Sequence, residues 1–128
     1  MISLFTPLKL GALTVPNRIF MAPLTRCRAT AEHIPTALMV EYYAQRASAG
    51  LIIAEATMVM EGNSAFWMEP GIYSAEQIAG WQQILQSLLV LDTDRRAAEF
   101  VGQPHRRDVH FALLEQLALR EFRRLVGA

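Results

Sequence analysis

Short apolar runs separated by glycine and proline mark the N-terminal part of the chain. Residues 8–15 alternate apolar and other positions on either side of Gly11, which predicts a β-hairpin. Residues 18–22 form a mostly apolar run stopped by Pro23, and residues 51–57 form a second such run. Runs of this length without alternation are typical of strands buried in a parallel sheet.

A helical segment separates these two predicted strands. Thr36 is a candidate N-cap for a helix over residues 37–48, which Gly50 ends. Strand, helix and strand in this order predict a βαβ unit with adjacent, parallel strands. The carboxyl ends of both strands then lie at one edge of the sheet, and we expect Thr25 and Ala56 within about 10 Å of each other.

A long loop and a second helix follow the second strand. Residues 58–73 have no periodicity and contain turn residues, which predicts a loop. Ser74 and Gln77 have the Ser-x-x-Gln spacing of a capping box, and helical spacing of apolar residues follows them. The charged segment 92–96 predicts a break, with residues 88–91 either ending this helix or forming a short strand.

Composition and charge exclude several classes of partner. No apolar run approaches the roughly 18 residues that a membrane span requires, so we expect no membrane partner. Twelve basic residues balance twelve acidic ones, which argues against a nucleic-acid partner. The single cysteine, Cys27, has no partner for an internal disulfide, and no basic region precedes an apolar segment at the N-terminus. The expected location is therefore the cytoplasm.

Several strings within residues 1 to about 83 carry a more specific signal. They read PLKLG at 7–11, PNRI at 16–19, MAPLTR at 21–26, EYYAQRA at 41–47, GLII at 50–53, EAT at 55–57, PGIYS at 70–74 and QIAGW at 77–81. In this order and spacing they resemble the N-terminal part of the Old Yellow Enzyme family of flavin oxidoreductases, which includes N-ethylmaleimide reductase.

The resemblance implies a fold, a cofactor and a reaction. Members of that family are TIM barrels that hold FMN, which takes a hydride from NAD(P)H and passes it to an activated alkene or a similar electrophile. The matching cofactor-binding residues here are Pro23, Leu24 and Thr25 along the flavin ring, with the Thr25 hydroxyl at the flavin edge, and Ala56 against the ring. Without the resemblance, Pro23 would simply end a strand, Thr25 would satisfy a turn and Ala56 would pack in a core. No catalytic and no metal-binding residue is carried over.

Four other residues have two interpretations each. Glu55 lies in a predicted buried strand and needs an Arg or a cluster of N–H donors, and a structural ion pair is favoured over a catalytic base. Cys27 is interpreted as a small core or loop residue. Phe66 and Trp67 either border a substrate pocket, as the resemblance implies, or anchor their loop.

The sequence therefore predicts an α/β fold made of the opening hairpin and first two βα units of a TIM barrel, followed by a helical C-terminal tail. The predicted division is 1–83 for the barrel segment and 84–128 for the tail, whose last helix covers 108–127. A shifted reading frame, a fusion or a substitute structural element would each explain the tail. A complete barrel takes about 250 residues, so the predicted barrel is incomplete.

The predicted function is that of a fragment of an FMN-dependent ene-reductase, inactive alone. The phosphate of FMN is bound by loops after strands seven and eight in such barrels, so tight FMN binding by this chain alone is not expected. The flavin-contacting Gln, the paired His residues and the Tyr proton donor of the family also have no match here. The alternative is a non-catalytic interaction or self-association protein that uses its last helix.

Overall fold

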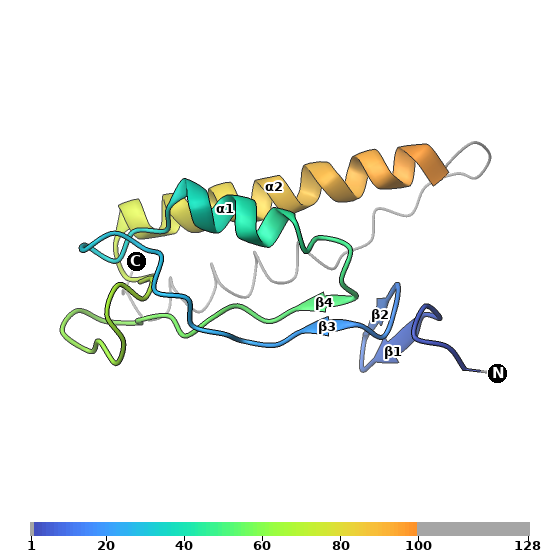
Figure 1. The fold of residues 1–128 in the computed structure, drawn as a ribbon, viewed down its shortest axis with the longest axis horizontal. Coiled ribbons are helices and arrows are strands. Elements are labelled where there is room, and N and C mark those ends of the chain that lie inside the picture. The colour runs from blue at the N-terminus through green and yellow to red at the C-terminus, as the bar shows by residue number, and fades with distance from the viewer. Residues whose placement is uncertain (1, 100–128) are drawn as a thin grey trace. The chain divides into compact units, whose positions relative to one another are not determined.

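The computed structural model describes residues 2–99 (Figure 1). In chain order the elements are β1 (Leu8–Leu10), β2 (Leu13–Val15), β3 (Phe20–Met21), α1 (Ala37–Ala44), β4 (Leu51–Ile52) and α2 (Ala75–Glu99). The helix predicted over residues 108–127 lies outside the described residues.

The predicted N-terminal hairpin is confirmed. Strands β1 and β2 pair antiparallel, with Leu8 opposite Val15 and Leu10 opposite Leu13. Gly11 occupies the turn with φ +58°, a left-handed conformation that costs glycine little and other residues more.

The predicted parallel pairing is also confirmed, since β3 and β4 pair with Phe20 opposite Leu51 and Met21 opposite Ile52. Both strands are shorter than the predicted runs 18–22 and 51–57. The Ile53 N–H still donates to the Met21 carbonyl at 3.1 Å, but farther along the Glu55 side chain supplies the bond between the two segments. A side chain has replaced the backbone ladder, which ends the regular sheet.

Gly50 allows the chain to enter β4 against the residues before β3. A Cβ atom at this position would overlap the main-chain carbonyl of Asn17. The Asn17 side chain donates to the Ser48 carbonyl at 2.9 Å and accepts from the Ile19 N–H at 3.0 Å. These bonds hold the starts of the two strands together.

Helix α1 begins where predicted but ends earlier. After Ala44 the chain continues in tighter turns, with the Arg46 N–H donating to the Tyr43 carbonyl at 2.9 Å. Bonds of this type often satisfy the carbonyls left open at a helix end. Thr36 is the N-cap residue, but its hydroxyl donates to the Arg28 carbonyl at 2.7 Å instead of capping the helix. The predicted N-cap position is therefore confirmed, although the Thr36 side chain makes no capping bond.

Helix α2 starts with the predicted capping box and continues farther than predicted. The Gln77 side-chain oxygen accepts from the N–H of Tyr73 at 3.0 Å and of Ser74 at 3.2 Å, while the Gln77 N–H donates to the Ser74 hydroxyl at 3.3 Å. The predicted break at 92–96 is wrong, and so is a strand at 88–91, because the helix runs to Glu99. No glycine or proline occurs from residue 81 to 99, and leucine, glutamine, alanine and arginine dominate this stretch and favour helix.

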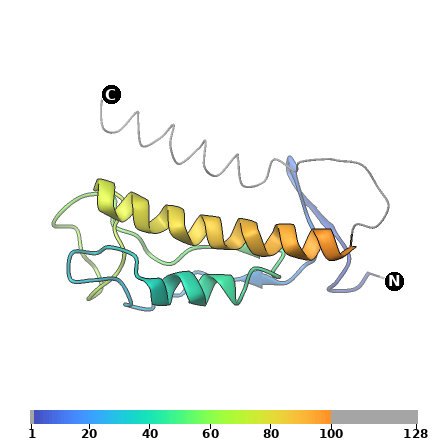
Figure 2. The same ribbon diagram turned by 90° about the horizontal axis from the view of Figure 1, so that it is seen from above.

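The two helices lie side by side over one face of β3 and β4 and run antiparallel to the strands (Figures 1 and 2). Buried Met39 and Tyr43 from α1 and Ile84 and Leu88 from α2 form much of the core. Within residues 2–99, β3 and β4 form a two-stranded sheet that is not closed. None of the described helices is both long and apolar enough to cross a membrane.

Candidate functional site

The four residues singled out from the sequence emerge from the same end of the parallel pair. Pro23, Leu24 and Thr25 follow β3, and Ala56 follows β4. Pro23, Leu24 and Ala56 are exposed and Thr25 is half-buried, so all four are accessible to a ligand. The separation of Thr25 and Ala56 and their assignment to a cofactor stay predictions.

A hydrogen bond joins the residues next to the two segments. The Arg26 N–H, directly after Thr25, donates to the Glu55 carboxylate at 2.9 Å, and Glu55 directly precedes Ala56. The structure therefore ties the chain after β3 to the chain after β4 at the predicted edge of the sheet.

Glu55 is buried, with 4% of its surface exposed, and both of its carboxylate oxygens accept hydrogen bonds. The donors are the Arg26 N–H and the Tyr43 hydroxyl at 3.3 Å. The expected ion pair with an arginine does not form within the described residues, because the Arg26 guanidinium points to the ring of Tyr42, 5.3 Å from its centroid. A backbone N–H and a phenol take the place of the cation.

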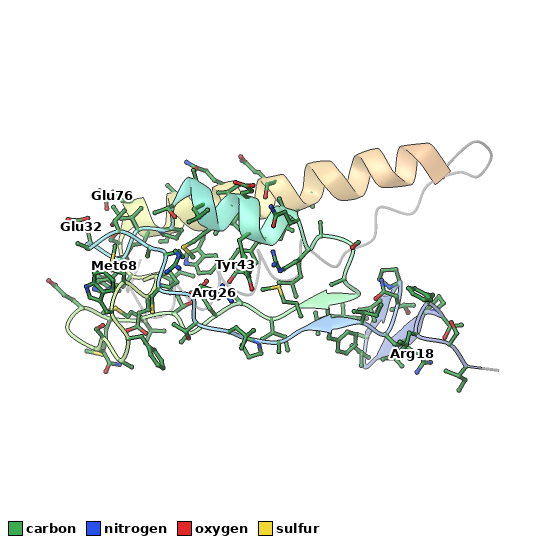
Figure 3. The ribbon with its side chains drawn as sticks, in the orientation of Figure 1. Arg18, Arg26, Glu32, Tyr43, Met68 and Glu76 are labelled. Atoms are coloured by element: carbon green, nitrogen blue, oxygen red, sulfur yellow. The ribbon has the colours of Figure 1, made fainter. Side chains whose placement is uncertain are left out.

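Tyr43 is a neighbour of these segments that the sequence did not reveal. It points from α1 towards the strand ends where Arg26 lies (Figure 3), and 1% of its surface is exposed. Its hydroxyl donates to the Glu55 carboxylate and accepts from the Glu55 N–H at 3.2 Å. Burial, together with the adjacent Glu55 charge, raises the pKa of Tyr43 to about 12. A buried tyrosine usually needs a hydrogen-bond partner for its hydroxyl. That requirement is the only signal in the sequence that points to a contact between Tyr43 and a buried polar group.

The loops that follow the two strands are fastened to each other. The Ala29 N–H donates to the Met68 carbonyl at 3.1 Å, the Gly71 N–H donates to the His33 carbonyl at 2.7 Å, and Nδ1 of His33 lies 2.7 Å from the Glu69 carbonyl. Cys27, His33 and Met68 have φ values of +53°, +63° and +54°. Such conformations cost a non-glycine residue about 1–2 kcal/mol each, and the cross-loop bonds hold them in place.

The loop after β4 presents its aromatic residues to solvent. Trp67 is 79% exposed and Phe66 is 49% exposed, so Trp67 does not anchor this loop within the described residues. Glu69 holds the loop instead, since its carboxylate accepts from the Ala65 N–H at 2.6 Å. Burial opposes ionisation of Glu69, but this bond, the Phe66 N–H and the Ser64 hydroxyl outweigh it and lower the pKa of the carboxyl. Cys27 is a half-buried loop residue.

A hollow of about 620 Å³ lies between these loops and the start of α2. Its lining includes the acidic residues Glu32, Glu61 and Glu76. None of the four candidate cofactor residues lines it, and its acidic rim is unsuited to a phosphate group. Residues 2–99 also contain no group of three or more His, Cys, Asp or Glu side chains that could hold a metal ion.

Comparison with known proteins shows the family of the chain. The sequence profile described as the NADH:flavin oxidoreductase / NADH oxidase family matches residues 3–90. A protein of Leishmania infantum named "Probable flavin mononucleotide-dependent alkene reductase" is 50% identical over 82 residues, which are 64% of this chain and 22% of that protein.

Solved structures agree. The Old Yellow Enzyme homologue from Zymomonas mobilis is 52% identical with a TM-score of 0.67, over 71% of this chain and 26% of that one. Morphinone reductase in complex with tetrahydroNAD is 45% identical with a TM-score of 0.66, over 71% of this chain and 25% of that one. The chain thus spans about a quarter of the length of the proteins it matches. Because the profile matches residues 3–90, which are well over half of the chain, the chain belongs to the NADH:flavin oxidoreductase / NADH oxidase family.

Proposed function

We propose that residues 2–99 form the opening of a TIM barrel in which Pro23, Leu24, Thr25 and Ala56 contact the flavin ring of FMN. FMN is the cofactor that membership of this family implies. The observation that carries the proposal is the bond between the Arg26 N–H and Glu55, because it brings the two segments together at the carboxyl edge of parallel strands. Ligands of α/β barrels bind at this edge.

The described residues suit a flavin ring. The Ala56 side chain is small and exposed, which leaves room for a planar ring. The Thr25 hydroxyl makes no hydrogen bond within residues 2–99, so it is available to a ligand. A hydroxyl at the ring edge would stabilise the electron-rich reduced flavin. When bound, FMN supplies the hydride transfer.

The full reaction requires a complete flavin and substrate site. We propose an ene-reductase in which NAD(P)H reduces FMN and the hydride then passes to an activated alkene or similar electrophile. The alkene reductase relative and the morphinone reductase structure with tetrahydroNAD support this assignment. The division at residue 83 also stays a proposal, and α2 continues across it.

We expect this chain alone to bind FMN weakly and to have little or no activity. Residues 2–99 supply one pair of parallel strands, whereas the phosphate site of such barrels lies in the loops after strands seven and eight. Residues 2–99 contain no such loops, so the charge-assisted bonds that anchor the FMN phosphate are missing from this part of the chain.

The test is a titration of the purified, isotope-labelled full chain with FMN, followed by NMR. We expect a colourless protein on purification, and FMN-dependent shifts of the Leu24, Thr25 and Ala56 amides at high flavin concentration. Riboflavin, which lacks the phosphate, is the matched control and should bind with nearly the same affinity. A stable yellow protein with one flavin per chain would contradict weak binding. Shifts confined to the acidic hollow, for example at Tyr73, would contradict the assigned site.

Self-association is a second candidate function. Ile53 is 44% exposed and Phe20 is 39% exposed beside the open sheet, and apolar side chains also project from the loop after β4. Apolar surface gathered in this way commonly marks a protein contact.

A further inference from the structure

A single buried carboxylate lies behind both segments of the proposed flavin site. Glu55 directly precedes Ala56, and its carboxylate accepts the hydrogen bond from the N–H directly after Thr25. The exposed segments are therefore supported by one buried side chain that does not itself face the ligand edge.

The Arg26 bond is the main fixed point of its segment. Among main-chain N–H groups from residue 22 to residue 28, that of Arg26 alone has a hydrogen-bond partner within the described residues. Residues 22–28 form no regular element in this structure. Removing this bond would leave the main chain between Met21 and the Arg28 carbonyl, which accepts from the Thr36 hydroxyl, with no hydrogen bond to another segment within the described residues.

Tyr43 fixes the carboxylate in turn. Its hydroxyl donates to one Glu55 oxygen and accepts from the Glu55 N–H, so side chain and main chain of the same residue are both bound. The Tyr43 ring packs 6.0 Å from that of Trp81, whose indole N–H donates to the Gly71 carbonyl at 3.0 Å. The carboxylate is thus held by Tyr43 of α1, whose ring in turn packs against Trp81 of α2.

We propose that Glu55, oriented by Tyr43, is a positioning residue that fixes the main chain at Arg26 and so presents Pro23–Thr25 and Ala56 to the flavin. This inference rests on the proposed flavin site. Glu55 does not touch the ring and takes no part in the hydride transfer. Glu55 holds the flavin-contacting segment in place before FMN binds. The segment then loses less conformational entropy on binding, so the affinity for FMN increases.

The variants separate the hydrogen bond from packing. Glu55→Met keeps a side chain of similar length but removes both acceptors, whereas Glu55→Gln retains an oxygen that can accept from Arg26. Tyr43→Phe removes only the hydroxyl. Tyr42→Phe is its matched control, because the Tyr42 hydroxyl makes no hydrogen bond within residues 2–99. Glu69→Met is the matched control, because Glu69 is also a buried carboxylate but accepts its hydrogen bond within the loop after β4.

The first measurement is amide hydrogen exchange of the full-length chain without ligand. In Glu55→Met the exchange rate of the Arg26 amide should rise about tenfold or more, because its acceptor is gone. Tyr43→Phe should raise it about threefold, and Glu55→Gln should restore most of the protection. The second measurement is the FMN titration, in which the dissociation constant should rise about threefold to tenfold in Glu55→Met and Tyr43→Phe but not in either control.

Each outcome decides the proposal. Unchanged Arg26 exchange in Glu55→Met, or an effect equal to that of Glu69→Met, would overturn it. If Glu55→Met does not fold, the comparison of Tyr43→Phe with Tyr42→Phe decides, and equal Arg26 exchange in these two would overturn the role of Tyr43. If the unmodified chain shows no FMN-dependent shifts, the proposed function fails, while Arg26 exchange still reports whether Glu55 fixes this segment.

Discussion

At the scale of single residues, Tyr43 and Glu55 show how two buried polar groups satisfy each other. Leaving either one without a partner would cost about 1–3 kcal/mol, since a buried polar group loses its bonds to water. The phenol acts as donor to the carboxylate and as acceptor from the main chain of the same residue. This reciprocal pairing explains how a carboxylate can be 4% exposed without a guanidinium beside it.

The raised pKa of Tyr43 predicts a loss of stability at high pH. The unfolded phenol ionises near its ordinary value of 10.0, whereas the folded one stays protonated up to about 12. Between these values the folded state binds more protons than the unfolded state, so the free energy of unfolding falls as pH rises. The contribution is complete below about pH 10 and is lost as pH passes through about 12.

Urea unfolding across this pH range tests the prediction. Tyr43→Phe should have a shallower alkaline decline than the unmodified chain, whereas Tyr42→Phe should decline as steeply as the unmodified chain. Equal slopes in all three proteins would show that the Tyr43 phenol does not remain protonated in the folded state.

The identity of the Glu55 partners could not be predicted from the sequence alone. A buried carboxylate indicated only that some donor was needed, and arginines are abundant in this chain. The donor turned out to be the main-chain N–H of Arg26 while its guanidinium stacks on Tyr42. The choice depends on how the chain turns after β3, which no local pattern encodes.

At the scale of elements, the capping box predicts a measurable contribution to α2. The Gln77 side chain accepts from two N–H groups ahead of the helix and donates to the Glu32 carbonyl at 3.0 Å. Gln77→Ala should lower the free energy of unfolding by about 1–3 kcal/mol, because it removes these bonds at a buried position. Gln83→Ala, an exposed position of the same helix, should change it by less than about 0.5 kcal/mol. Chemical denaturation measures both, and equal effects would contradict a capping role.

Elements set by local sequence were predictable, and those set by distant contacts were less so. The hairpin around Gly11 and the start of α2 at Ser74 depend on a few adjacent residues, and both are confirmed. The strand lengths depended on where Glu55 replaces the backbone ladder, so they were overestimated. The charged segment 92–96 predicts a break, but it contains no glycine or proline and the helix continues through it to Glu99.

At the scale of the whole molecule, the fold class could be predicted but the site only through resemblance. Apolar runs and helical spacing predicted an α/β arrangement with parallel strands, which the pairing of β3 and β4 confirms. Nothing in these patterns distinguishes Thr25 or Ala56 from ordinary strand-end residues. Their assignment to a flavin site rests on the sequence strings that resemble a flavin oxidoreductase family. The comparisons show that the chain belongs to that family.

The open sheet leads to a prediction about association. Within residues 2–99, β3 and β4 each have a partner strand on one side only, and Ile53 is exposed beside them. Unpaired edges and apolar side chains favour pairing with another chain. We therefore expect the purified protein to associate with itself as its concentration rises, as measured by sedimentation equilibrium.

The location of this contact can be tested with two equivalent substitutions. Ile53→Lys places a charge beside the sheet, where it should oppose strand pairing and weaken association about tenfold or more. Val59→Lys makes the same change at a side chain that is 65% exposed in the loop after β4, and it should have little effect. If both substitutions weaken association equally, general apolar adhesion explains it and the sheet edge does not. A protein that stays monomeric at the highest concentrations reached would contradict association altogether. The open edge of the β3–β4 sheet would then be stable in water without a partner chain.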